Sequence, residues 1–179
     1  MASLGTPGSE HGALVGTKNH KLVEKYSILF VCDANMCRSP MAAVSFKAFL
    51  KSQGQSEANW RVESAGIRAT QNCPATTNAQ EVVAEQGLDL SHHLSQAVTK
   101  DLVESFHLIL TMAKLQQQIL HQLCPDISNR VLMLSQVIGI EKDITDPTGM
   151  PKNIHYGILK EIQSYFKSGW KKILLLSRT

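Results

Sequence analysis

The sequence lacks an apolar run long enough to cross a membrane, and it lacks any long block of basic residues. The apolar stretch 173–176 is far shorter than the roughly 20 residues of a transmembrane helix, and no apolar segment follows a basic start at the N-terminus. A net charge of +3, with Lys and Arg scattered, is not the basic footprint of a nucleic-acid-binding protein. We therefore expect a cytoplasmic protein that binds neither membranes nor nucleic acid.

Cysteine is also scarce. The chain has four cysteines, Cys32, Cys37, Cys73 and Cys124, which are too few for a disulfide scaffold, and none forms the C-x-x-C pair typical of structural zinc sites. Cys73 and Cys124 lie far apart in the sequence, so they lack the short spacing of a redox relay. We expect both to be small buried apolar side chains. No metal or cofactor is predicted.

The length and composition favour one globular domain. A chain of 179 residues, 43% of them apolar and 18% charged, can bury one hydrophobic core but is too short for two ordinary domains. Residues 1–22 are rich in Gly, Ser, Thr and His and show no apolar period, so we expect a flexible N-terminal extension there. The predicted domain spans residues 23–179.

Within this domain, apolar runs alternate with amphipathic segments. Residues 28–31 form a continuous apolar run that is typical of a strand buried on both faces of a parallel sheet. Further strands are predicted at 60–64, 108–110 and 131–134, and helices after Ser39, over 75–86, up to about 123, and over 154–170. This alternation predicts an α/β fold, a single-domain four-stranded parallel sheet with helices on both faces.

The first strand leads into the segment C-D-A-N-M-C-R-S-P (32–40), which connects it to a helix. Loops between a parallel strand and a helix N-terminus gather backbone N–H groups that bind phosphate-like anions. The loop residues expected to bind the anion are Asp33, Ala34, Asn35, Met36, Cys37 and Arg38. Asn35 is the loop residue best suited to a left-handed backbone conformation, because the loop contains no glycine.

Two side chains of this segment carry chemistry. Cys32 lies at the base of the loop, where amide dipoles and a guanidinium favour a nucleophilic thiolate. Arg38 follows six positions later and can return over the loop to bind two phosphate oxygens with its planar fork. We expect Ser39 to cap the following helix and to donate a hydrogen bond to the thiolate, with Pro40 in the first turn.

A proton donor for a leaving group is predicted in the loop before the last helix. Asp146 precedes Pro147, which disfavours helix at Asp146 and stiffens its placement. That loop also emerges at the carboxyl edge of the sheet, so Asp146 can reach the anion site. Asp143 is a nearby alternative.

These residues resemble the low-molecular-weight protein-tyrosine-phosphatase family. The shared segments are V-C-D-A-N-M-C-R-S-P (31–40), E-S-A-G (63–66), G-L-D-L-S-H-H (87–93), L-I-L-T-M (108–112) and D-I-T-D-P (143–147). The resemblance implies the phosphotyrosine phosphatase I-like fold, no metal, and a cysteinyl-phosphate intermediate on Cys32. It implies that Arg38 clamps the phosphoryl group and that Asp146 is the general acid and then the base.

The resemblance also implies a set of supporting residues. Asn35, Ser39 and Ser64 would form the supporting hydrogen-bond network, and one of the two histidines at 92–93 would help to orient the loop. Cys37 would match a second loop cysteine that can form a protective disulfide with the nucleophile.

Several positions depart from the family pattern. Ala34 stands where the family usually has Gly, Asp33 is acidic beside an anion site, and Ala43 replaces a common Glu. Thr148 follows Asp-Pro where eukaryotic members have aromatic residues. The branch of the family that resembles protein-arginine phosphatases carries Thr where this chain has Met36. A bulky apolar residue at this position suits a substrate with an aromatic ring better.

The sequence therefore favours a phosphatase that acts on protein phosphotyrosine or similar aryl phosphomonoesters. The alternatives are a protein-arginine phosphatase or an arsenate reductase on the same fold, or a catalytically weak anion-binding pseudophosphatase. The expected partner is a phosphorylated protein, and the expected state is a monomer or weak dimer.

Overall fold

The computed structural model describes residues 25–178, so the predicted extension over residues 1–22 lies outside the described residues. Its strands are β1 (Tyr26–Cys32), β2 (Trp60–Gly66), β3 (Leu108–Thr111) and β4 (Val131–Met133). Its α-helices are α1 (Arg38–Ser52), α2 (Thr77–Ala84), α3 (Lys100–Glu104), α4 (Lys114–Leu123) and α5 (Lys152–Leu176). Three 3-10 helices, η1 (Glu57–Asn59), η2 (Pro125–Arg130) and η3 (Leu134–Ile138), complete the described secondary structure.

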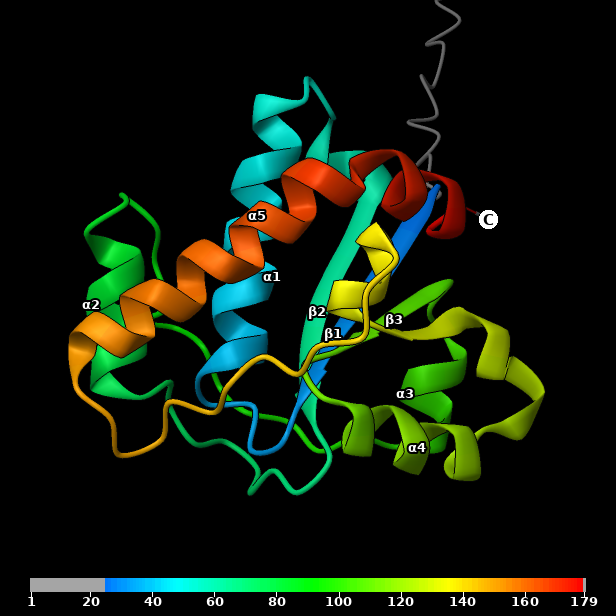
Figure 1. The fold of residues 1–179 in the computed structure, drawn as a ribbon, viewed down its shortest axis with the longest axis horizontal. Coiled ribbons are helices and arrows are strands. Elements are labelled where there is room, and N and C mark those ends of the chain that lie inside the picture. The colour runs from blue at the N-terminus through cyan, green and yellow to red at the C-terminus, as the bar shows by residue number, and fades with distance from the viewer. Residues whose placement is uncertain (1–24, 179) are drawn as a thin grey trace, which may run out of the picture.

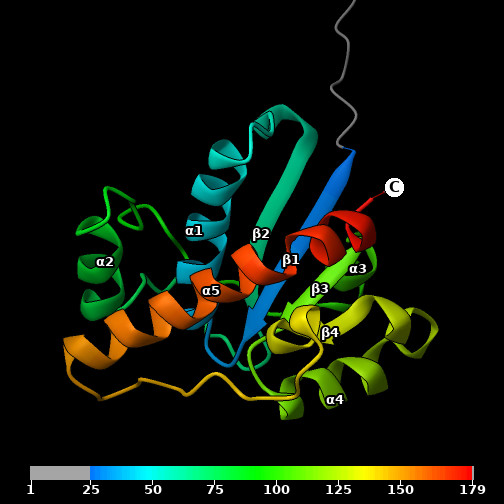
Figure 2. The same cartoon turned by 45° about the horizontal axis from the view of Figure 1, so that its top comes forward.

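The four strands form one parallel sheet in the order β2-β1-β3-β4. Because β2 and β3 lie on opposite sides of β1, the strand order reverses at the carboxyl end of β1, which is where open α/β sheets bind their ligands. The loops 33–37, 67–76 and 139–151 come together at this edge of the sheet (Figures 1 and 2). The predicted four-stranded parallel fold is confirmed.

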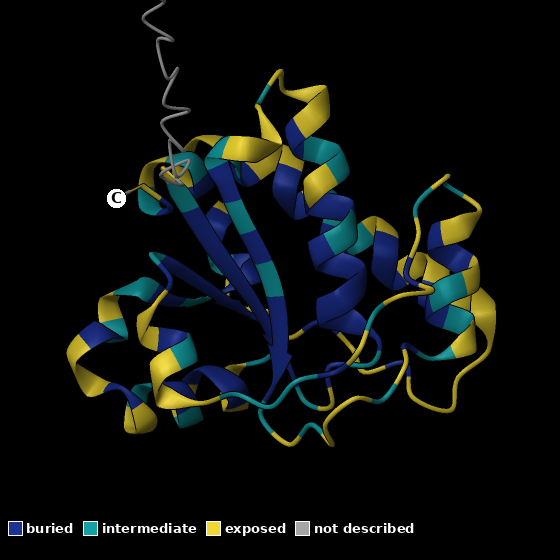
Figure 3. Ribbon diagram, turned by 180° about the vertical axis from the view of Figure 1, so that it is seen from behind, coloured by how far each residue is buried: buried dark blue, intermediate teal, exposed yellow. Residues whose placement is uncertain are grey.

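Helices cover both faces of the sheet, as predicted. One hydrophobic core lies between the sheet and α1, α2 and α5, and a second lies between the sheet and α3 and α4. Figure 3 shows the resulting buried interior, with the exposed residues on the outer sides of the helices. The continuous apolar run of β1 serves both cores, because Ile28 and Phe30 face the first and Leu29 and Val31 face the second.

The larger core is built around aromatic rings. Phe46 of α1 is fully buried, and its ring centroid lies 5.6 Å from that of Phe30, 5.0 Å from that of Phe166 and 5.6 Å from that of Trp60. These edge-to-face contacts join β1, β2, α1 and α5. They hold the start of α1, and with it the loop 33–37, against the sheet.

Some element boundaries differ from the sequence-based prediction. Helix α2 spans only Thr77–Ala84 rather than 75–86, because Thr76 caps its start and the chain turns at Gly87, where φ is +72°. Strand β4 ends at Met133, since η3 begins at Leu134. Helix α3 and the three 3-10 helices have no counterpart in the prediction, because they are too short for an apolar period to mark them.

Among residues 25–178, no helix is both long and apolar enough to cross a membrane.

Replacing Phe46 with Ala should lower the free energy of unfolding by about 3–5 kcal/mol, because the substitution leaves a cavity among packed rings. Urea denaturation followed by circular dichroism measures the change. Leu175→Ala is the control, since Leu175 is 69% exposed and its removal should change stability by less than about 0.5 kcal/mol. Equal losses in the two variants would contradict this description of the core.

Candidate active site

The loop 33–37 connects the end of β1 to the start of α1, so its backbone surrounds the N-terminus of a helix. Cys32 is the last residue of β1, and its side chain is 2% exposed. Arg38 is the first residue of α1 and is also buried, at 5% exposure. The arrangement brings a sulfur atom, the N–H groups of a helix N-terminus and a guanidinium to one point. Such a site favours an oxyanion.

Ser39 supports the cysteine but does not cap the helix, so one part of its predicted role is wrong. Helix α1 begins two residues earlier than expected, at Arg38, with Cys37 rather than Ser39 at the N-cap position. The Ser39 hydroxyl lies 3.0 Å from Cys32 Sγ. It also accepts a hydrogen bond of 2.9 Å from the Asn35 side-chain amide, so its own proton can be donated either to the sulfur or to the Ala65 carbonyl oxygen 3.3 Å away. The expected contact between Ser39 and the cysteine is therefore present.

Asn35 holds the shape of the loop. Its φ is +55°, the left-handed conformation that the sequence predicted, and its side chain is completely buried. Asn35 Nδ2 donates to Ser39 Oγ and to Ser64 Oγ, both at 2.9 Å, and Asn35 Oδ1 accepts from the Gln96 backbone N–H at 2.9 Å. The amide side chain thus connects α1, β2 and the segment before α3. Ser64 therefore contacts Asn35, and its supporting role in the reaction stays a prediction.

The outer side of the loop is held by contacts with distant segments. The ring N–H of His93, at Nε2, donates to the Asn35 carbonyl oxygen at 2.7 Å, and burial lowers the pKa of His93 below its usual value. The Thr76 backbone N–H donates to the Met36 carbonyl oxygen at 2.9 Å. Of the two adjacent histidines, the structure therefore places His93 against the loop, whereas His92 is exposed.

Gly66 lies directly beneath the loop, and sequence reasoning did not single it out. A Cβ atom at this position would lie 2.6 Å from the Asp33 carbonyl oxygen and 2.8 Å from the Asn35 backbone nitrogen. Any side chain there would displace the backbone of the loop. The glycine of the segment E-S-A-G was the available signal, and its reason is this close approach.

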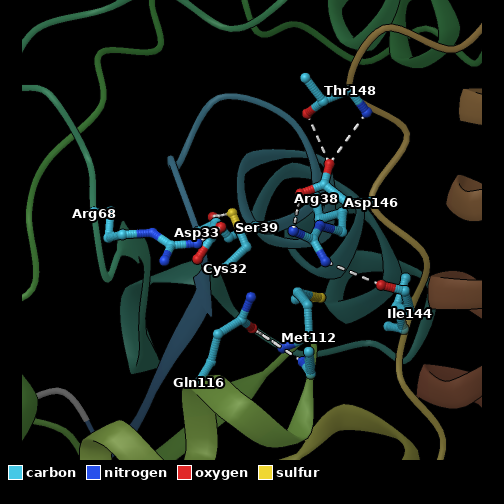
Figure 4. A network of polar contacts seen from close by, with 11 residues as sticks. Cys32, Asp33, Arg38, Ser39, Arg68, Met112, Gln116, Ile144, Asp146 and Thr148 are labelled. Carbon is cyan, nitrogen blue, oxygen red and sulfur yellow. Dashed lines mark hydrogen bonds and ion pairs between the residues drawn. The ribbon is translucent and has the colours of Figure 1, made fainter.

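Arg38 is held by two groups from the loop before α5 (Figure 4). Its Nη1 donates to the Ile144 carbonyl oxygen at 3.0 Å, and its Nη2 forms an ion pair with Asp146 Oδ2. The other carboxylate oxygen, Oδ1, accepts from the Thr148 backbone N–H at 3.1 Å and from the Thr148 hydroxyl at 2.8 Å. The structure therefore brings Asp146, 42% exposed at its side chain, to the predicted arginine.

The loop reaches Arg38 because Ile144 anchors it to the sheet. The Ile144 side chain is 1% exposed, and its backbone N–H donates to the Met112 carbonyl oxygen at the end of β3. Asp143, the alternative proton donor, points elsewhere, because its carboxylate accepts from the Lys114 backbone N–H at the start of α4. The geometry therefore favours Asp146 over Asp143.

The departures from the family pattern are accommodated without disturbing the loop. Asp33 pairs with Arg68 at 2.5 Å, so its charge is balanced beside the site. Ala34 is exposed, and among the described non-glycine residues only Asn35 and Asn72 have a positive φ. The position that demands a left-handed conformation is therefore Asn35 and not Ala34.

The remaining cysteines differ in burial. Cys37 is 6% exposed, and burial, together with the neighbouring Cys32, raises the pKa of its thiol to about 12. Cys124 is buried in the core beneath α3 and α4, as predicted, but Cys73 is only partly buried because it lies in the loop 67–76. Cys73 and Cys124 thus belong to different parts of the fold, and all four cysteines are free. A disulfide between Cys32 and Cys37 stays a prediction.

A pocket of about 130 Å³ opens above Cys32. Its lining residues are Cys32, Ala34, Met36, Cys37, Arg38, Thr76, Asp146 and Thr148. Within residues 25–178, no cluster of His, Cys, Asp or Glu side chains suits a metal ion. A nucleophilic sulfur, a cation and a carboxylate meet in this pocket. Covalent phosphoryl transfer requires groups of these three kinds.

The fold and this pocket define a class, a cysteine-dependent phosphatase built on a parallel α/β domain. Over residues 27–174 the sequence matches the pattern described as low molecular weight phosphotyrosine protein phosphatase, and the protein belongs to that family. The resemblance inferred from the sequence is therefore confirmed.

Relatives within the family differ in the substrates for which they are named. The chain is 33% identical to a protein-arginine-phosphatase of Bacillus subtilis over 147 residues, which cover 82% of this chain and 95% of the relative. It is 40% identical to EpsP of Ralstonia nicotianae, a probable low molecular weight protein-tyrosine-phosphatase, over 121 residues. These residues cover 68% of this chain and 77% of the relative. Among solved structures, the YwlE arginine phosphatase with a phosphorylated active-site serine matches this fold with a TM-score of 0.77 and 32% sequence identity. The match covers 83% of this chain and 95% of the other.

Replacing Gly66 with Ala should lower turnover of an aryl phosphate by about a hundred-fold, because displacing the loop by even about 1 Å misaligns the reacting groups. Steady-state kinetics and protection from iodoacetate by vanadate measure the two consequences. Gly157→Ala is the matched control, since a Cβ there meets nothing within 4 Å. Near wild-type turnover in Gly66→Ala would show that the loop does not need this close approach.

The raised pKa of Cys37 predicts a loss of stability at alkaline pH. The pKa of the Cys37 thiol is 9.0 in its ordinary state and about 12 in the folded protein. Between these two pH values the unfolded chain releases a proton that the folded chain keeps. The free energy of unfolding should therefore fall as pH rises, by on the order of 1 kcal/mol at pH 10. Urea denaturation at pH 7 and pH 10 should show this loss in the wild type and a smaller one in Cys37→Ala; identical losses would refute the assignment.

Proposed function

We propose that the enzyme hydrolyses phosphotyrosine in phosphorylated proteins through a phosphocysteine intermediate on Cys32. The observation that carries the proposal is the meeting of Cys32, Arg38 and Asp146 in one pocket at the carboxyl edge of the sheet. These residues come from β1, α1 and the loop before α5, and a shared role in one reaction accounts for all three.

In the first half of the reaction, the phosphoryl group sits in the loop with its oxygens on the backbone N–H groups and Arg38. Cys32 Sγ attacks phosphorus, the sulfur–phosphorus bond forms, and the bond from phosphorus to the tyrosine oxygen breaks. Asp146 transfers its proton to that oxygen as it leaves. Ser39 stabilises the sulfur while it is charged, because its hydroxyl lies 3.0 Å away.

In the second half, water releases the phosphate. The Asp146 carboxylate takes a proton from the water as its oxygen attacks phosphorus, and the sulfur–phosphorus bond breaks. Cys32 returns as a thiolate and inorganic phosphate leaves the loop. Arg38 and the loop N–H groups stabilise the charge of both transition states, which is the largest contribution expected in such a site.

The walls of the pocket favour an aryl leaving group. The lining surface is mostly apolar, with contributions from Ala34, Met36 and Cys37. A flat ring fits such walls better than a charged guanidinium, and the acidic side chain beside the loop, Asp33, is already paired with Arg68. Phosphotyrosine is therefore the first choice of substrate.

Phosphoarginine is the second candidate. Sequence similarity favours it, because the chain is 33% identical to a protein-arginine-phosphatase over 95% of that relative's length. The carboxylate of Asp146 is also 42% exposed and can accept hydrogen bonds from a guanidinium.

We propose a cytoplasmic location and a monomer or weak dimer on the earlier sequence grounds alone.

A side-by-side assay of phosphotyrosine, phosphoserine and phosphoarginine peptides should give the highest kcat/KM with phosphotyrosine. Cys32→Ser should abolish turnover of every substrate, because a hydroxyl is a far weaker nucleophile at neutral pH. A kcat/KM for phosphoarginine above that for phosphotyrosine would shift the assignment to the second candidate. No turnover of any peptide by the reduced wild type would support a pseudophosphatase.

Asp146→Asn should lower kcat on phosphotyrosine by about a hundred-fold, because the leaving oxygen loses its proton donor. Asp143→Asn is the control, since Asp143 contacts the start of α4 instead of the pocket. Burst kinetics with a chromogenic aryl phosphate separate the two halves of the reaction. If Asp146→Asn retained the wild-type rate and Asp143→Asn lost it, the assignment of the acid would be wrong.

A further inference from the structure

Thr148 makes two contacts with Asp146 that no step of the proposed reaction uses. Its backbone N–H and its hydroxyl both donate to Oδ1, at 3.1 and 2.8 Å. Oδ2 pairs with Arg38, and both Asp146 and Thr148 line the pocket. Figure 4 shows the carboxylate between the two residues, with Thr148 on the side away from the guanidinium. The two oxygens of Asp146 therefore have different surroundings.

These surroundings determine which oxygen can carry a proton. Oδ1 already accepts two hydrogen bonds, and protonating it would set its new O–H against two donors. Oδ2 has only the guanidinium as a partner, and an incoming phosphoryl group competes for that guanidinium. When the phosphoryl dianion shares Arg38, Oδ2 loses part of its contact with the guanidinium, whereas Oδ1 keeps both contacts with Thr148.

We propose that Thr148 is a positioning residue that holds Oδ1 of Asp146, so that Oδ2 bears the proton given to the leaving group. This inference rests on the proposed function. The hold of Thr148 on the carboxylate does not depend on Arg38, so it persists when the phosphoryl group draws the guanidinium away. Thr148 itself touches neither phosphorus nor the leaving oxygen in this role and acts only through Asp146.

The substitution Thr148→Val tests this role. Valine keeps the shape of the side chain and the backbone N–H but removes the hydroxyl donor, and Thr148 is exposed, so the fold should be retained. The quantity to compare is kcat/KM, which reports the first half of the reaction and excludes the hydrolysis of phosphocysteine. For phenyl phosphate, whose leaving group needs the proton, kcat/KM should fall about ten-fold, as for one lost hydrogen bond to a charged group. For 2,4-dinitrophenyl phosphate, whose leaving group needs little protonation, kcat/KM should change less than about two-fold.

Three further variants make the result specific. Thr148→Ser restores the hydroxyl and should recover most of the lost rate. Thr145→Val, in the same exposed loop, is the matched control and should leave both rates unchanged. In an Asp146→Asn background, Thr148→Val should cause no additional loss, because a residue that acts through Asp146 has nothing left to position.

The outcomes separate this inference from the proposed function. If Asp146→Asn slows phenyl phosphate hydrolysis and Thr148→Val does not, the enzyme assignment stands and the role of Thr148 is wrong. If Thr148→Val slows both substrates equally, or adds its full effect in the Asp146→Asn background, its role is merely structural and the inference is overturned. If Asp146→Asn itself retains the wild-type rate, the proposed function fails first.

Discussion

The buried amide side chain of Asn35 is the constraint on which the site depends. A left-handed conformation at a non-glycine residue costs on the order of 1–2 kcal/mol, and here it is offset by hydrogen bonds to Ser39, Ser64 and the Gln96 backbone. The turn directs the loop backbone around the N-terminus of α1. Because Ser39 is a shared partner, the group that shapes the loop also orients the hydroxyl beside Cys32.

Arg38 illustrates how the charges of the site stabilise one another. A guanidinium at 5% exposure needs partners, since an unpaired buried charge is strongly destabilising. The Ile144 carbonyl oxygen and the Asp146 carboxylate supply them from a single loop. The proposed catalytic acid thus also keeps Arg38, the proposed phosphate clamp, in place, and a substrate that binds Arg38 would change the surroundings of the acid.

The positions that depart from the family pattern affect the periphery of the loop more than its backbone. Asp33 is balanced by Arg68, and Ala34 is exposed. Ala43 lies at the edge of a larger hollow of about 340 Å³, which also involves Ser64 and His93 behind the loop. A small residue at Ala43 leaves this hollow open without removing any of the hydrogen bonds to Asn35.

Local patterns in the sequence determined much of this protein: the buried strand β1, the helix that follows it, the loop from Cys32 to Arg38 and the left-handed turn at Asn35. Each is a property of neighbouring residues, which periodicity and backbone sterics make visible. Only the tertiary structure decided that Gly66 lies beneath the loop, that His93 rather than His92 contacts Asn35, and that Asp146 rather than Asp143 meets Arg38. Those contacts join residues 31 to 108 positions apart, and they depend on how parallel strands bring their loops to one edge of the sheet.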